Sequence, residues 1–198
     1  MTQDNTNLCT WYWLRLKCFF SKLIKLKCKE TYVHTITFRN YAPNGGAGGG
    51  SAVQSCQKIL LPELNKQPVK YTFKEDNKYS INHKNELWDL FGAIEFVRQK
   101  TKNDRGAVYI THDYASAYAL ALLGRKYILV YHLQGPRVEE KINFGEKFSK
   151  TTTEIIQKCE KIAFQKAFYV CFPSDGAYDY FCNSKYTKLQ PSDFIKGP

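Results

Sequence analysis

The sequence predicts an α/β fold in which helices flank a parallel β-sheet. Short segments rich in β-branched and aromatic residues alternate with longer segments of helical periodicity between residues 31 and 172. Such alternation implies right-handed βαβ units. The chain has 198 residues, of which 43% are hydrophobic, with 12 glycines and 7 prolines. This composition suits one globular domain and excludes collagen-like, disulfide-stapled and disordered proteins.

Five segments are expected as strands because β-branched and aromatic residues dominate them. They are Tyr32–Phe38, Val69–Phe73, Ala107–Thr111, Tyr127–Tyr131 and Phe168–Phe172. Four helices are expected between them, at residues 51–61, 85–102, 114–123 and 151–167. Asp113 can cap the third helix and Gly124 ends it, while Thr151 to Glu154 form a capping box that opens the fourth. Residues 134–140 are expected as a polar loop, and Pro173 with Ser174 as a turn.

The 7 cysteines include no C-x-x-C pair, and no histidine lies at a zinc-finger spacing from them. This pattern argues against a disulfide framework and against a zinc site, so we expect reduced cysteines and no metal ion. No run of eighteen uncharged apolar residues occurs, and Asp4, Arg15 and Lys17 interrupt the region where a signal peptide needs an apolar run. The sequence therefore predicts a cytoplasmic protein.

Residues 1–30 stand apart as a basic segment. The chain has a net charge of +11. Six of its lysines and arginines lie between residues 15 and 29, and this stretch contains no acidic residue. Aromatic and apolar residues recur between these cations at the spacing of an amphipathic helix, which is typical of a segment lying on an anionic membrane surface. The residues expected at the membrane are Trp11, Trp13, Arg15, Lys22, Lys25 and Lys29. One alternative is a helix packed on the domain with solvated lysines. Nucleic-acid binding is disfavoured because no recognised module accompanies the charge.

Ligands of parallel sheets bind outside the carboxyl ends of the strands. A glycine-rich loop follows the first expected strand, and its candidate diphosphate-binding residues are Gly45, Gly46, Gly48 and Gly49. Their backbone N–H groups can approach an anion, and the helix that starts near Ser51 points its positive end at the same place. The loop lacks the lysine of a Walker motif and the third glycine of the dinucleotide fingerprint. We therefore expect a diphosphate and no nicotinamide cofactor, with an unliganded turn as the alternative.

His132 ends the fourth expected strand on the face where the glycine loop should lie, and it is the candidate catalytic residue. A lone histidine is more often structural, and this remains the alternative. The further candidates for binding a sugar or an acceptor also follow strands: His112, Asp113, Gln134, Arg137, Glu139 and Ser174. Their polar and charged groups suit sugar hydroxyls or a phosphate. The alternative for Glu139 is an exposed acidic residue next to Glu140. For His112 the alternatives are a residue that supports the site from behind, without contacting the ligand, and the start of a helix cap.

Four short motifs in this order resemble the amino-terminal lobe of glycosyltransferases with the two-lobed B-type fold, especially the family-four group of retaining enzymes. The resemblance covers roughly residues 31–184. The motifs are Gly45-Gly46-Ala47-Gly48-Gly49, Thr111-His112-Asp113-Tyr114, Val130-Tyr131-His132-Leu133-Gln134-Gly135-Pro136, and Glu160-Lys161-Ile162-Ala163-Phe164 leading to Phe172-Pro173-Ser174-Asp175-Gly176-Ala177. The resemblance implies a Rossmann-like lobe.

In this family the glycine loop lies against the diphosphate of a nucleotide sugar, and the histidine after the fourth strand lies near the transferred sugar. The resemblance assigns these roles to Gly45, Gly46 and His132. It implies no cofactor and no metal ion, with the nucleotide sugar as a substrate. The expected acceptor is a glycan or a lipid-linked molecule in cell-surface polysaccharide or glycolipid synthesis. The expected location is peripheral, on the inner face of the cell membrane.

The family's second lobe, which binds most of the nucleotide sugar, has no counterpart in this sequence. Residues 31–184 are expected to form the acceptor-side lobe, and residues 185–198 a tail like the linker between lobes. Two functions remain open. The chain is part of a transferase, as a fragment or together with a separate donor-binding chain, or it is a non-catalytic acceptor-binding or scaffold subunit. A nicotinamide-dependent oxidoreductase is disfavoured by the failed fingerprint.

Overall fold

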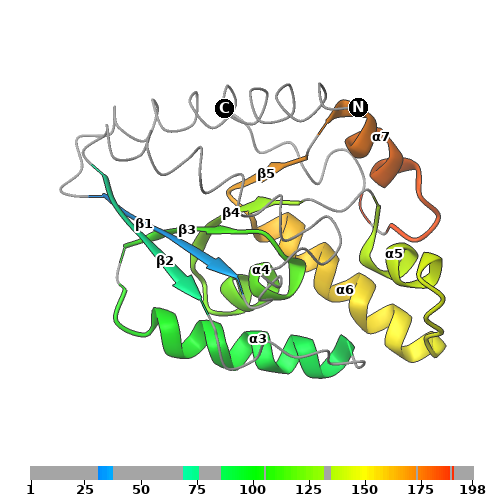
Figure 1. Cartoon of the computed structure of the whole chain (residues 1–198), viewed down its shortest axis with the longest axis horizontal. Coiled ribbons are helices and arrows are strands. Elements are labelled where there is room, and N and C mark those ends of the chain that lie inside the picture. Colours follow the sequence, from blue (N-terminus) through cyan, green and yellow to red (C-terminus); the bar gives the residue numbers. More distant parts are fainter. Residues whose placement is uncertain are drawn as a thin grey trace.

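The computed structural model of the chain describes residues 31–37, 69–75, 86–104, 106–131, 135–172, 174–187 and 189. Within them lies one five-stranded sheet in the order β2-β1-β3-β4-β5 (Figure 1). The strands are β1 (Thr31–Thr37), β2 (Val69–Glu75), β3 (Val108–Thr111), β4 (Lys126–Val130) and β5 (Tyr169–Cys171). The helices are α3 (Glu86–Thr101), α4 (Tyr114–Leu122), α5 (Arg137–Asn143), α6 (Lys150–Lys166) and α7 (Asp175–Asn183).

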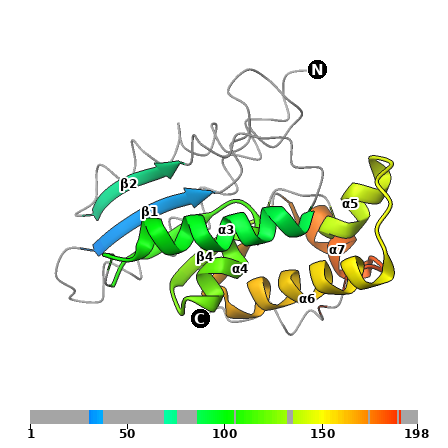
Figure 2. The same ribbon diagram turned by 90° about the horizontal axis from the view of Figure 1, so that it is seen from below.

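All neighbouring strands of this sheet run parallel, which confirms the predicted α/β class and is compatible with a Rossmann-like arrangement. The connections β2 to β3, β3 to β4 and β4 to β5 all advance in the same direction across the sheet. Right-handed crossovers therefore place α3, α4 and α6 on one face. Figure 2 shows these three helices side by side as a layer against the strands.

The strand order changes direction between β1 and β3. From β1 the chain passes to β2 on one side, and then it returns across β1 to β3 on the other side. At such a switch point two consecutive connections leave in opposite directions, which opens a crevice outside the carboxyl ends of the two strands. Any ligand site of this sheet is therefore expected near the ends of β1 and β3, after Thr37 and Thr111.

The core contains an aromatic cluster beside the carboxyl ends of β4 and β5. The rings of Tyr131, Phe164, Phe172 and Phe181 lie within 4.9 to 6.0 Å of one another between centroids. Tyr131, Phe164 and Phe181 are at most 1% exposed. Aromatic rings at these spacings bury large areas and favour edge-to-face contacts. The cluster joins α6 and α7 to the end of β4.

Most predicted element bounds differ from the observed ones by one or two residues. Asp113 caps α4, as predicted, by accepting a hydrogen bond from the backbone N–H of Ser116. The cap predicted for α6 was wrong. Ser149, not Thr151, accepts from the N–H of Thr152. A helix that begins one residue after Ser149 satisfies its first donors with that hydroxyl.

Two segments expected to be irregular are helices. The expected polar loop holds α5, which begins at Arg137, and the expected turn at Ser174 is the cap of α7. Both helices are short, with seven residues in α5 and nine in α7, and α5 holds few apolar residues, so a sequence pattern has little length in which to show. The predicted helix at 51–61 and the basic segment 1–30 lie outside the described residues. None of the described helices combines the length and the apolar character needed to cross a membrane.

Replacing Phe181 by alanine should destabilise the fold strongly. Phe181 is fully buried and contacts the other rings of the aromatic cluster. The cavity left behind should lower the free energy of unfolding by about 3–5 kcal/mol. Urea denaturation followed by circular dichroism measures this loss. The matched control is Phe168→Ala, at a phenylalanine that is 54% exposed, and equal losses in the two variants would contradict the assigned core.

Candidate functional site

The starts of three helices meet at the carboxyl edge of the sheet, where they hold a buried ion pair. Arg137 opens α5 and points its guanidinium at Glu86, the first residue of α3. The Arg137 Nε donates to Glu86 Oε1 at 2.8 Å, and Nη2 donates to Glu86 Oε2 at 3.1 Å. The hydroxyl of Tyr114, at the start of α4, donates to Glu86 Oε1 at 2.7 Å. The pair therefore ties α3, α4 and α5 together.

Both partners of this pair are almost inaccessible to water. Glu86 is 3% exposed and Arg137 is 5% exposed. Burial alone disfavours the charged guanidinium, but Glu86 and the nearby Glu140 outweigh it and hold the pKa of Arg137 above its ordinary value. Arg137 also donates to Glu140 through Nη1. The guanidinium thus has two carboxylate partners, and a bidentate pair of this kind fixes geometry as well as charge.

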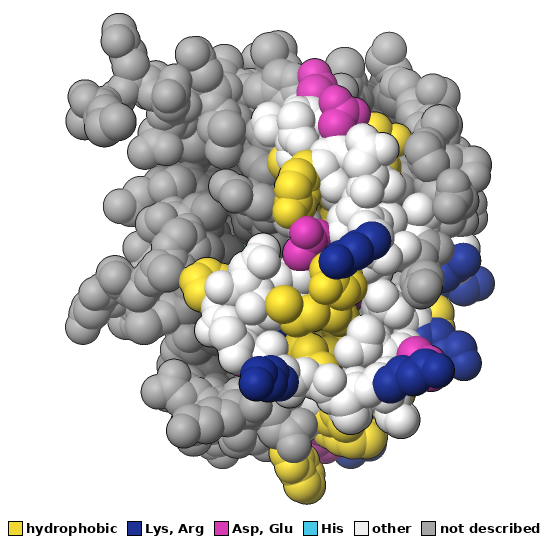
Figure 3. Space-filling view, turned by 90° about the vertical axis from the view of Figure 1, so that its right-hand side faces the viewer, with side chains coloured by type: hydrophobic (Ala, Val, Ile, Leu, Met, Phe, Trp, Pro, Cys, Tyr) yellow, Lys and Arg dark blue, Asp and Glu magenta, His cyan; other side chains and the backbone are white. Residues whose placement is uncertain are grey.

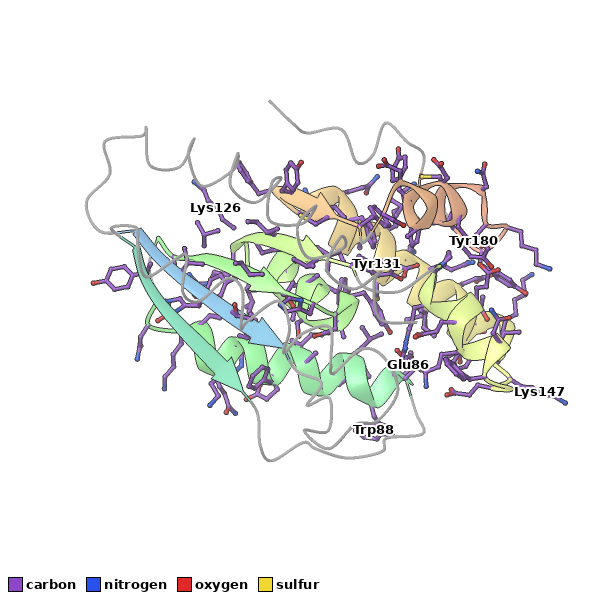
Figure 4. All side chains as sticks on the ribbon, turned by 45° about the horizontal axis from the view of Figure 1, so that its top comes forward. Glu86, Trp88, Lys126, Tyr131, Lys147 and Tyr180 are labelled. Atoms are coloured by element: carbon purple, nitrogen blue, oxygen red, sulfur yellow. The ribbon has the colours of Figure 1, made fainter. Side chains whose placement is uncertain are left out.

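Glu160, on α6, lies next to this ion pair at 2% exposure. Its Oε1 accepts from the hydroxyl of Tyr131 at 2.5 Å and from the backbone N–H of Arg137 at 3.0 Å. Pro136 caps α5 without a side-chain hydrogen bond, so Glu160 supplies the missing acceptor for the first turn of that helix. Burial raises the pKa of Glu160 to about 7, and the two hydrogen bonds oppose that rise. Figure 4 shows Glu86 and Tyr131 inside the fold, while Trp88 and Lys147 project outward.

Gly135 lies where the chain leaves β4 and turns into α5. A Cβ atom at this position would meet Cε1 of Tyr180 at 2.8 Å, closer than carbon atoms can approach. Its carbonyl oxygen lies 3.1 Å from the hydroxyl of Tyr131. A phenol has one hydrogen, and the shorter contact, to Glu160, takes it. A side chain at position 135 would displace the Tyr180 ring, so the glycine allows this ring to lie against the start of α5.

The predicted binding residues in the described part of the chain hold positions at this edge, and several have internal partners. The Glu139 carboxylate accepts from the hydroxyls of Tyr180 and Ser184, which joins α5 to α7. Ser174 accepts from the N–H of Ala177 as the cap of α7. The alternative of an exposed, free Glu139 was wrong, because its half-buried carboxylate has these two partners.

Asp113 and His112 follow β3 and are buried, at 6% and 3% exposure. Besides capping α4, Asp113 accepts from the hydroxyl of Ser116 at 2.7 Å. Arg137 belongs to the same group of predicted binding residues, and it is engaged in the ion pair described above. The remaining member, Gln134, lies outside the described residues. Contacts of these residues with a sugar or an acceptor stay predictions.

Several predicted site residues lie outside the described residues, and their roles stay predictions. They are the glycines Gly45, Gly46, Gly48 and Gly49, the candidate catalytic His132, its neighbour Gln134, and the expected membrane residues Trp11, Trp13, Arg15, Lys22, Lys25 and Lys29. The structure does describe the ends of β1 and β4, the strands that precede the glycine motif and His132 in the sequence. Among the described residues no group of three or more His, Cys, Asp or Glu side chains could hold a metal ion.

Glu86, Tyr131 and Glu160 were not singled out as functional from the sequence. Tyr131 and Glu160 belong to two of the motifs quoted above, but no role was assigned to them, and Glu86 was an ordinary polar position at the start of a predicted helix. One signal was present for Glu160. It recurs on α6 with Ile156, Cys159 and Ala163, all of them buried, at helical spacing. An acidic residue on the apolar face of a helix requires a buried partner.

Removing Arg137 should cost far more stability than removing an exposed arginine. In Arg137→Ala the buried carboxylate of Glu86 loses its cation, and the expected loss is about 3–5 kcal/mol. The control, Arg98→Ala, breaks an exposed pair with Glu95 and should leave the unfolding midpoint unchanged. Urea denaturation compares the two. If the double variant Glu86→Gln with Arg137→Met is no more stable than Arg137→Ala, the uncompensated charge is not the cause of the loss.

Comparison with known proteins leaves this site without a precedent. No protein-family model, no curated protein and no solved structure matches the chain. The chemistry of the carboxyl edge therefore has to be argued from its own residues and geometry.

Proposed function

We propose that this chain forms the acceptor-side lobe of a glycosyltransferase that moves a sugar from a nucleotide sugar to a glycan or a lipid-linked acceptor. One observation carries the proposal. In the sequence the glycine motif follows β1 and residues 172–177 follow β5, while the motifs at 111–114 and 130–136 begin at the last residues of β3 and β4. Because the strands are parallel, the ends of all four lie at one edge of the sheet. The strands that precede these motifs, which are scattered over more than 130 residues, thus end at the edge where α/β proteins bind their ligands.

The strand order adds a reason to expect a diphosphate there. The glycine loop follows β1 and the Thr111-His112-Asp113 segment follows β3, so the two flank the switch point. A loop of this composition presents backbone N–H groups, and nearby helix starts add positive dipole ends. Both would stabilise the negative charge that develops on a leaving nucleoside diphosphate. In this proposal His132, directly after Tyr131, lies near the transferred sugar.

The buried cluster serves this site as a rigid support. The Glu86–Arg137 pair fixes the starts of α3 and α5, and Glu139 fixes α5 to α7. Transfer requires the donor and the acceptor hydroxyl to be held within a few tenths of an ångström of their reactive positions. Helix starts locked by ion pairs and aromatic packing can provide that precision, whereas solvent-exposed loops alone would lose it to motion.

We place the protein at the inner face of the cell membrane as a peripheral protein, through its basic segment. Figure 3 looks at the end of the molecule that holds α5 and α7, and its coloured residues mix Lys and Arg with acidic and hydrophobic side chains. The described part of this face is not a strongly basic surface. Membrane contact is therefore proposed for residues 1–30, which carry six cations between residues 15 and 29.

Calorimetric titration tests the proposed function. UDP, GDP and their nucleotide sugars are titrated into the chain, alone and together with the polypeptide encoded immediately downstream. We expect binding in at least one setting, and His132→Ala should weaken binding of the nucleotide sugar about tenfold, equivalent to about 1.4 kcal/mol. The control variant is Lys166→Ala, at an exposed residue in the last turn of α6. Glycan binding without nucleotide binding in either setting would favour the non-catalytic acceptor-binding subunit instead.

Charge reversal in the basic segment should abolish vesicle binding. In the triple variant Lys22→Glu, Lys25→Glu and Lys29→Glu the electrostatic attraction to anionic lipid becomes repulsion, since each cation contributes about 1 kcal/mol at the surface. Cosedimentation with vesicles of phosphatidylcholine and phosphatidylglycerol measures the effect.

The charge-matched control changes Lys150, Lys158 and Lys166, which are exposed on α6, to glutamate. It alters the net charge equally and should retain vesicle binding. Equal binding by both triple variants would show that residues 1–30 do not hold the protein on the membrane.

A further inference from the structure

Charge counting in the buried cluster shows a shortage of positive charge around Glu160. The cluster holds the carboxyl groups of Glu86, Glu140 and Glu160 but, in the described part of the chain, one guanidinium, that of Arg137. Glu86 takes two of the Arg137 nitrogens and Glu140 takes the third. Glu140 is also half-exposed, so water solvates its charge. Among the described members of the cluster, Glu160 is the carboxyl group that is buried and has no ion pair with a cation.

The hydrogen bonds of Glu160 fit a carboxyl group that carries a proton. Both of its hydrogen bonds within the described residues go to Oε1, from Tyr131 and from the N–H of Arg137. A neutral carboxyl group has one carbonyl oxygen that accepts and one hydroxyl oxygen that bears the proton. Oε1 therefore acts as the carbonyl oxygen, which leaves Oε2 to bind the proton. A buried carboxylate with two neutral donors and no cation is costly, and protonation removes that cost.

The described groups around Glu160 come from α3, α5, α7 and the end of β4. Tyr131 follows β4, Arg137 and Glu140 lie on α5, and Glu86 reaches the site through Arg137. From α7 comes the apolar ring of Phe181, which packs on Tyr131. Burial raises the pKa of Tyr131 well above its ordinary value, so the phenol stays protonated and acts as a donor. Glu160 is the acid of this cluster that titrates near neutral pH, with a pKa of about 7.

We propose that Glu160 is a proton-binding residue coupled to the ligand site, whose carboxyl group takes up a proton when an anion occupies the carboxyl edge and releases it when the anion leaves. The inference rests on the proposed function for the identity of that anion, a nucleoside diphosphate. In the proposed function the anion binds at the loop after β1, and Glu160 accepts from the hydroxyl of Tyr131, directly after β4. The β1 and β4 strands flank β3, so their ends are about 10 Å apart, which gives the order of the separation between the two charges. Across that distance in a protein interior, a unit charge changes a neighbouring equilibrium by roughly tenfold. An ionised Glu160 should thus weaken binding of the anion, and its protonation should restore that binding.

The proton on Glu160 also stabilises the fold itself. The folded chain binds this proton more tightly than the unfolded chain, because the pKa rises from 4.5 to about 7 on folding. The stabilisation is complete below about pH 4.5 and is lost as the pH rises through about 7. Glu160→Gln keeps an oxygen for Tyr131 and Arg137 but does not titrate. It should remove this pH dependence, which thermal melts between about pH 5 and pH 8 would show.

The first experiment follows the N–H signals of Arg137 and Gly135 by ¹⁵N NMR as the pH rises in the ligand-free chain. We expect the Arg137 signal to titrate with a midpoint near pH 7 in the parent and to stay constant in Glu160→Gln. The control Glu154→Gln, at an exposed residue of the same helix, should titrate like the parent. Tyr131→Phe removes a hydrogen bond that lowers the pKa of Glu160, so its midpoint should be higher. No titration of the parent between about pH 5 and pH 9, or titration that persists in Glu160→Gln, would overturn the inference.

The second experiment measures proton uptake when UDP binds, by calorimetry at pH 7 in two buffers of different ionisation enthalpy. A tenfold rise in proton affinity takes Glu160 from about half to about nine-tenths protonated, so we expect uptake of about 0.4 proton per UDP. Proton uptake by UDP itself is the same with the parent and with Glu160→Gln. The variant should therefore lose only the uptake of about 0.4 proton that belongs to Glu160. UDP binding with equal uptake in both chains would overturn the coupling and leave the proposed function standing. If none of the nucleotides binds, with or without the second polypeptide, while the Arg137 signal still titrates, both the proposed function and the coupling fail, and Glu160 remains a proton-dependent cap of α5.

Discussion

The buried pair between Glu86 and Arg137 is the interaction on which the carboxyl edge of the sheet depends. It joins residues 51 positions apart, at the first residues of α3 and α5, and Tyr114 adds the start of α4. A hydrophobic contact could also hold these helices together, and such replacements are often neutral or stabilising in other proteins. An ion pair with two directed hydrogen bonds adds a fixed orientation. A ligand site needs that orientation more than it needs stability.

The bonding requirements of the buried Arg137 guanidinium explain the surroundings of Glu160. A guanidinium that is 5% exposed must be fully bonded, and Glu86 and Glu140 meet that need. Within the described part of the chain the cluster then holds more acid than base, and Glu160 is the carboxyl group with no ion pair. Its position is nevertheless fixed, because α5 begins at a proline cap and has no acceptor of its own for the Arg137 N–H. A local requirement of helix capping thus places a titratable group beside the proposed ligand site.

The sequence was sufficient for the regular part of the fold and insufficient for the cluster. Strands were recognisable because β-branched runs such as Ala107 to Thr111 have a local cause, and Asp113 was recognisable as a cap for the same reason. The helices α5 and α7 were missed because their stability comes from contacts made after folding, such as Glu139 with Tyr180. Arg137 was expected to bind a ligand, since nothing near it in the sequence indicates a partner as distant as Glu86. Contacts between distant residues are set by topology, which periodicity does not encode.

The strand order connects the regular part of the fold with the buried cluster. The same parallel arrangement that brings the motif segments to one edge also brings the starts of α4, α5 and α7 there, because each of these helices follows a strand. Their positive dipole ends favour an anion, while the acidic first turns of α5 and α7 partly cancel that preference. In the proposal, the charge on Glu160 adds to these opposing contributions of helix ends and acidic side chains, so its protonation would favour binding of an anion. A residue with a pKa of about 7 has the greatest effect at such a point, because small changes in its surroundings change its charge.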